Sequence, residues 1–137
     1  MDSAATNGNP IDLTLTIPAS SDHIRFARLV ASAAATRLGF DYDTVEDLRI
    51  AVSEMCTAVV EACEGEGTLT LIYCADGEVG IRIDGHAAFR DGMAAGVERD
   101  ELVGHILEAV TDEHSLDLGP TGGSFMLRMG SSRPSDS

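Results

Sequence analysis

Residues 43–63 constrain the fold more than any other part of the chain, because they carry one apolar stripe at helical spacing. The apolar positions recur three or four residues apart, which places them on one helix face: Val45, Leu48, Val52, Met55, Val59 and Ala62. Asp43, followed three residues later by Glu46, predicts a capping box at the start of this helix. A helix with one apolar face needs a second layer to cover that face.

Alternating apolar and polar residues predict the strands of that second layer. Residues 13–17 alternate and end at Pro18, which predicts a half-buried strand. Residues 69–73 and 79–83 alternate on either side of Asp76-Gly77, a pair that favours a hairpin with a two-residue type I′ turn. Two further strands are expected near 113–118 and 123–129.

The remaining segments complete a β α α β β α β β order. A helix over 21–38, capped by Ser20 or Ser21, should end at Gly39, and another helix is expected over 97–111. Residues 85–96 lack a sustained period, which indicates a loop or a short helical turn. The predicted class is α+β: a two-layer α/β sandwich, with a mainly antiparallel sheet covered on one face by about three helices.

The length and end composition predict one folded unit. With 137 residues and 44% hydrophobic content, the chain can bury one core but not two. Residues 1–10 and 130–137 are rich in small and polar residues and are expected to form flexible tails around a domain at 11–129.

The charge and cysteine content narrow the class of partner and the compartment. A net charge of −14 disfavours binding to nucleic acid or to anionic membranes and attracts a basic protein. Solubility alone can also explain the same charge. Cys56, Cys63 and Cys74 lie in apolar periodic segments, as buried reduced thiols do, and show no zinc-binding spacing. We find neither a signal peptide pattern nor a run of about 18 apolar residues, so a cytoplasmic location is expected.

Five segments resemble, in order, the elements of the anti-sigma factor and serine-protein kinase family within the GHKL (Bergerat-fold) ATPase superfamily. EDLRIAVSEMCTAVVEAC (46–63) resembles its N box helix, and DHIRFARLVASAA (22–34) its first helix. VGIRIDG (79–85), HILEAVTDE (105–113) and GGSFMLRM (122–129) resemble the strand before its glycine-rich nucleotide loop, its last helix and its final strand. The resemblance spans nearly the whole folded unit and implies the family's fold.

The resemblance also implies what a working nucleotide site would need. In the family, a glutamate of the N box helix orients the attacking hydroxyl or water, and an asparagine four residues later binds the magnesium of ATP. Glu54 matches the catalytic glutamate, but Ala58 stands at the asparagine position and offers no metal ligand. Glu54 can also be read as an ordinary solvated or cap-forming carboxylate, which the loss of the asparagine favours.

The glycine-rich motifs are also altered in ways that disfavour nucleotide binding. Asp84 and Gly85 match the start of the family's adenine-binding motif, but its two spaced glycines are replaced in 86–88; Asp84 fits a plain turn aspartate equally well. The segment 100–104 brings two carboxylates to the phosphate loop, where they would repel a triphosphate by up to several kcal/mol each. We therefore expect Asp84 and Gly85 to be remnants of a nucleotide site, with no cofactor bound and kinase activity lost or weak; ATP and magnesium would be needed only if that activity is retained.

The protein-binding surface of the family is the part that the sequence keeps. The family's partner-contacting arginine matches Arg28, which lies off the apolar stripe and can pair with a partner carboxylate, or can be an ordinary solvated arginine; Arg25 is a weaker candidate. His86 and His105 show no metal-ligand spacing, and Gly122-Gly123-Ser124 fits either a turn or an anion cradle.

By resemblance, three functions are open. The first is an anti-sigma factor that binds an alternative sigma factor and is released by partner switching with a STAS-type antagonist. The alternatives are an active serine-protein kinase that phosphorylates the antagonist and an orphan protein-binding regulatory module. The resemblance also implies a homodimer formed through the sheet face.

Overall fold

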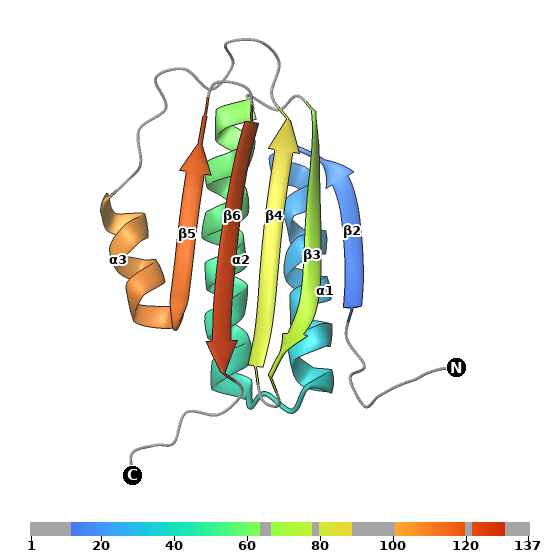
Figure 1. Ribbon diagram of the computed structural model, residues 1–137, viewed down its shortest axis with the longest axis vertical. Helices are drawn as coiled ribbons and strands as arrows, with labels where there is room; N and C mark the ends of the chain where they lie inside the picture. The colour runs from blue at the N-terminus through green and yellow to red at the C-terminus, as the bar shows by residue number, and fades with distance from the viewer. Residues whose placement is uncertain (1–11, 64–66, 78–79, 89–100, 120–121, 131–137) are drawn as a thin grey trace.

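The computed structural model describes residues 12–63, 67–77, 80–88, 101–119 and 122–130. Within them, five strands form one antiparallel sheet in the order β2-β3-β4-β6-β5, with three α-helices and one short 3-10 helix (Figure 1). The predicted tail 1–10 lies outside the described residues. Of the predicted tail 130–137, residues 131–137 also lie outside them, whereas Gly130 closes the last strand. No helix of the described part is long and apolar enough to cross a membrane.

The elements follow the order expected from the sequence. They are β2 (Asp12–Pro18), the 3-10 helix η2 (Ser21–His23), α1 (Ile24–Arg37), α2 (Tyr42–Cys63), β3 (Thr68–Asp76), β4 (Gly80–Ala88), α3 (Glu101–Val110), β5 (Glu113–Leu118) and β6 (Gly122–Gly130). Glycine provides a positive φ of 92° at Gly39, where α1 was expected to end.

Two layers enclose the core. Figure 1 shows α1 and α2 side by side behind the sheet, while α3 lies at its edge next to β5. The strand side chains that face α1 and α2 are buried, among them Leu69, Leu71, Tyr73, Ile83 and Leu127. The opposite face of the sheet carries no described helix. The α+β two-layer prediction is confirmed, with α1 and α2 forming most of the covering layer.

The start of α2 differs from the predicted capping box. Asp41, not Asp43, accepts a hydrogen bond from the Thr44 amide at 2.8 Å, and Glu46 pairs with Arg49 instead of reaching back. Hydrogen bonds from Thr44 lower the pKa of Asp41. Asp43 lies within the first turn, where its charge still favours the helix dipole. The box was misplaced by two residues because Asp41 and Asp43 both match the cap pattern.

The hairpin turn is longer than predicted. Asp76 pairs with Gly80, so three residues, 77–79, connect β3 to β4, and the two-residue turn is wrong. Gly77 has a positive φ of 70°, which is consistent with the glycine-dependent part of the prediction. The register still places Tyr73 opposite Ile83, so the buried faces of both strands coincide as expected.

Strand β4 continues through residues that the sequence predicted as loop. Gly85 and Ala87 are buried on the core face, but their small side chains hide the period of two. The Phe125 ring of β6 occupies the space above Gly85: a Cβ there would lie 2.3 Å from a ring carbon. Strand β4 lies between β3 and β6 and pairs with both, which stabilises its extended end.

A buried polar contact joins the two layers. The Tyr73 hydroxyl donates to the carbonyl of Ala27 at 3.0 Å, which ties β3 to α1. Burial raises the pKa of the Cys56 thiol from 9.0 to about 12, and burial also raises the pKa of Tyr73. All three cysteines are free; Cys56 and Cys63 are buried and Cys74 is half-buried.

These shifts predict a loss of stability at alkaline pH. The unfolded chain releases the Cys56 proton above pH 9, whereas the folded chain holds it to about pH 12. The free energy of unfolding should therefore fall across that window, by about 1.4 kcal/mol per pH unit for one fully retained proton. Urea unfolding at about pH 8 and about pH 10 should show a smaller decrease in Cys56→Ala than in the wild type. An equal decrease in both proteins would contradict this assignment.

Candidate functional site

A groove runs along the outer seam between α1 and α2. The Arg28 guanidinium of α1 donates to the Ser53 hydroxyl of α2 at 2.9 Å, and both side chains are half-buried. Two adjoining hollows share Arg28 and Arg49, and together they are lined by Arg25, Phe26, Arg28, Leu29, Ser32, Glu46, Arg49, Ile50, Ser53 and Glu54. Arg28 is therefore anchored within a concave surface and is not a freely solvated arginine.

Apolar side chains line the same groove at its surface. Leu29 is 67% exposed, and Phe26 and Ile50 are each 42% exposed. The Arg25 guanidinium lies 5.5 Å from the centroid of the Phe26 ring, a cation–π contact that holds an arginine beside an exposed aromatic face. Large exposed apolar groups beside cationic ones are typical of protein interaction surfaces.

Glu54 belongs to this groove and lies on α2 beside Ser53. Ala58 follows one turn later on the same helix and is also half-buried. A methyl group cannot bind a cation, and no group of three or more His, Cys, Asp or Glu side chains suited to a metal occurs among the described residues. Mg²⁺ takes oxygen ligands, so Ala58 offers none at the position where the family resemblance places the magnesium ligand.

Asp84 and Gly85 lie away from Glu54. The Asp84 side chain is on the helix-free face of the sheet, where Arg82 donates to both carboxylate oxygens at 2.9 and 3.1 Å. Gly85 faces the core beneath Phe125. The structure gives these residues an ion pair and a packing role and does not bring them together with Glu54. Their role as remnants of a nucleotide site stays a prediction; residues 89–100 and the side chains of 101–103 lie outside the described part.

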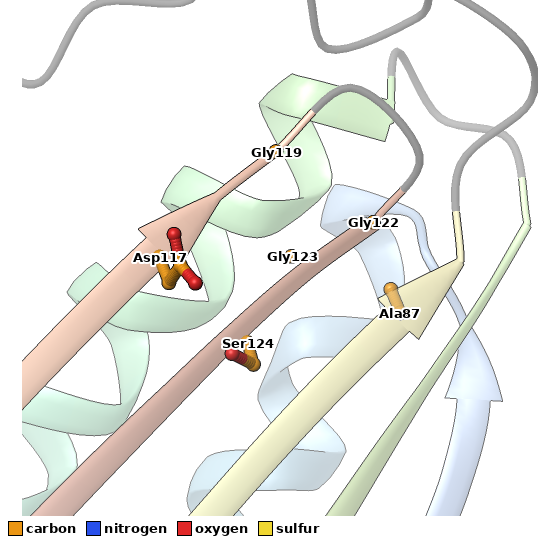
Figure 2. A pocket seen from close by; sticks show the side chains of 6 residues that line it. All are labelled: Ala87, Asp117, Gly119, Gly122, Gly123 and Ser124. Carbon is orange, nitrogen blue, oxygen red and sulfur yellow. The ribbon is translucent and has the colours of Figure 1, made fainter.

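The glycine run begins the last strand at the turn that joins β5 to β6, where the Gly119 amide donates to the Gly122 carbonyl at 2.8 Å. Gly122 opens β6, and a Cβ there would lie 2.8 Å from the Ala87 carbonyl, so glycine permits close strand packing. Figure 2 shows the shallow hollow beside it, where Asp117 and Ser124 extend from neighbouring strands β5 and β6. The Asp117 carboxylate would repel an anion at this place.

The structure places Arg25, Arg28 and Glu54, which the sequence analysis named, along this groove. Arg49, Ile50 and Ser53 also line it; they lie in the segment that resembles the N box helix, but none of them was singled out there. One signal was present: Phe26, Leu29 and Ile50 are large apolar residues outside the buried stripes of their helices. His86 and His105 are exposed, as expected for surface histidines.

Comparison with known proteins agrees with the fold. The sequence model of the histidine kinase-like ATPase domain family matches residues 17–123. The serine-protein kinase RsbW of Halalkalibacterium halodurans is 45% identical over 58 residues, which are 42% of this chain and 36% of that protein. The RsbW of Bacillus cereus (strain B4264) is 36% identical over 63 residues, 44% of this chain and 39% of that protein. Each match spans well under two thirds of the relative's length.

A solved structure gives the same result at the level of the fold. The crystal structure of the RsbU and RsbW domains of Rv1364c from Mycobacterium tuberculosis superimposes with a TM-score of 0.68 at 21% identity, covering 90% of this chain and 33% of that one. The observed two-layer fold therefore agrees with the sequence matches. The chain belongs to the histidine kinase-like ATPase domain family, as an RsbW-like member of the GHKL group.

Proposed function

We propose that this chain is a cytoplasmic anti-sigma factor that binds an alternative sigma factor through the α1–α2 groove and is released by a STAS-type antagonist. The groove carries the proposal: Arg28, the residue that matches the family's partner contact, is anchored there beside exposed apolar side chains. The kinship with RsbW proteins supports the class of partner. The net charge of −14 disfavours nucleic acid and anionic membranes as binding partners.

Capture from the native cell tests this function. The tagged full-length chain is expected to retain a sigma factor, and adding the purified chain to a transcription reaction driven by that sigma factor should inhibit it. An excess of the antagonist should then restore transcription. Retention of no sigma factor, together with unchanged transcription, would contradict the proposal.

The second part of the proposal is that the chain uses Mg-ATP weakly or not at all. Phosphoryl transfer depends on positioned charge around the phosphates, and Ala58 removes one magnesium ligand from that arrangement. We expect isothermal titration of the full chain with Mg-ATP to give no binding in the micromolar range. Radiolabelled ATP should transfer no label to the antagonist. Micromolar binding, or labelling that Glu54→Ala abolishes, would instead support an active serine-protein kinase.

A further inference from the structure

We propose that the α1–α2 groove takes an acidic amphipathic helix of the partner, and that Arg49 is a second partner-contacting cation which Glu46 holds in competition. This inference rests on the proposed function and names the chemistry of the partner segment at that site. The observation behind it is that three arginines and only two glutamates line the groove, whereas acidic residues dominate the whole chain. The sequence pointed only to α1 residues for partner contact, whereas this surface includes α2.

The arginines of the groove and those of the sheet differ in the groups that pair with their positive charge. On the helix-free face, Asp84 pairs with Arg82, and both Asp76 and Glu113 pair with Arg128. In the groove, Arg28 is held by a neutral hydroxyl and Arg25 by an aromatic ring. Within the described residues, neither has a carboxylate within salt-bridge distance. Two guanidinium groups are therefore available to a partner's acidic side chains.

Arg49 is the third cation, and it is already paired. Its guanidinium lies 3.0 Å from the Glu46 carboxylate in an exposed ion pair between residues three apart on α2. Exposed pairs of this kind are worth at most about 1 kcal/mol, so a partner carboxylate can replace Glu46 at small cost. Because Arg49 lines both hollows beside Arg28, an exchanged pair would extend the positive surface along the seam.

The shape and composition of the groove favour a helix as the occupant. A groove between two packed helices with exposed Phe26, Leu29 and Ile50 offers apolar contacts to one face of an incoming helix. Carboxylates one turn apart on that face can meet separate arginines. The net charge of −14 does not prevent this, because charges more than about 8 Å away are largely screened at physiological salt.

A synthetic probe tests the charge preference directly. The probe is a capped, alanine-based helical peptide of about 16 residues, with two leucines and two glutamates on one face. Its binding to the full chain is followed by fluorescence anisotropy, beside peptides with glutamine or lysine at the two glutamate positions. We expect the acidic peptide to bind at least about tenfold more tightly than either, which corresponds to about 1.4 kcal/mol. Equal binding of the three peptides would overturn the proposal.

Glu46→Gln tests whether Glu46 competes with the partner's carboxylate for Arg49 or affects binding only through the overall charge of the chain. It should free Arg49 and tighten binding of the acidic peptide about three- to tenfold. Most of that gain should disappear when Arg49→Ala is also present, because the freed cation is then missing. Glu61→Gln, an equal charge change at an exposed α2 position outside the groove, should alter affinity less than about twofold. A gain that persists without Arg49, or that Glu61→Gln reproduces, would refute the role of Arg49.

Failure of this inference can be distinguished from failure of the proposed function. If the acidic peptide binds with the expected variant pattern but no sigma factor is captured, the groove preference stands and the anti-sigma function fails. If a sigma factor is captured equally by the wild type, Glu46→Gln and Arg49→Ala, and the peptides show no charge preference, the function stands and this inference fails.

Discussion

Arg28→Glu is expected to abolish capture of the partner protein while leaving the chain folded. The substitution places a carboxylate where we expect the partner's own carboxylate to bind, and it removes the guanidinium that Ser53 orients. Loss of a central arginine contact costs about 2–4 kcal/mol, so the affinity should fall roughly 30- to 1,000-fold. Arg28→Lys keeps the charge but loses the planar fork and should give an intermediate loss.

The measurement needs a matched control on the same helix. Arg37→Glu makes the same charge change in the last turn of α1, at an exposed position outside the groove. Surface plasmon resonance with the co-purified partner should show a change of less than about fivefold for this variant. Circular dichroism melting should show both variants folded. A similar loss for Arg28→Glu and Arg37→Glu would mean that net charge, and not the groove, governs binding.

Gly85→Ala is expected to destabilise the fold strongly for a change of one methyl group. The new Cβ would meet ring carbons of Phe125 at 2.3 and 2.5 Å, and that ring is buried in the core with little room to move. Overpacking of this kind costs about 1–3 kcal/mol of unfolding free energy. Urea unfolding should show a lower midpoint with an unchanged slope.

Phe125→Leu provides the test of that mechanism. Leucine lacks the two ring atoms closest to the added methyl group, so the double variant should be scarcely less stable than Phe125→Leu alone. We expect a coupling free energy between the two sites of about 0.5–3 kcal/mol. Strict additivity would show that contact with the Phe125 ring does not cause the loss of stability.

The element order and fold class were predictable because they depend on local patterns. The stripe in α2, the alternation in β3 and the glycine at the end of α1 are each contained within a few turns or one strand. The end of β4 escaped prediction because Gly85 and Ala87 have side chains too small to show a period of two. The cap of α2 was misplaced because Asp41 and Asp43 carry the same side chain.

The candidate site was only partly predictable. The sequence pointed to Arg28 and Glu54 through the family resemblance, but the hydrogen bond from Arg28 joins residues 25 positions apart on two helices. No local pattern encodes such a contact. Asp84 was placed at a strand end, whereas pairing with β3 and β6 keeps it inside β4 and directs it to the helix-free face.

The sequence by itself determined which segments become helices and strands, which of their faces are apolar, and that Ala58 offers no ligand to a metal, since these are properties of single residues and short spacings. Only the tertiary structure decided that Gly85 lies beneath Phe125, that Ser53 holds Arg28, and that Arg49 and Ile50 complete a groove with α1. These contacts arise when the apolar faces of the helices and the sheet pack together, because packing brings distant residues within reach of one another.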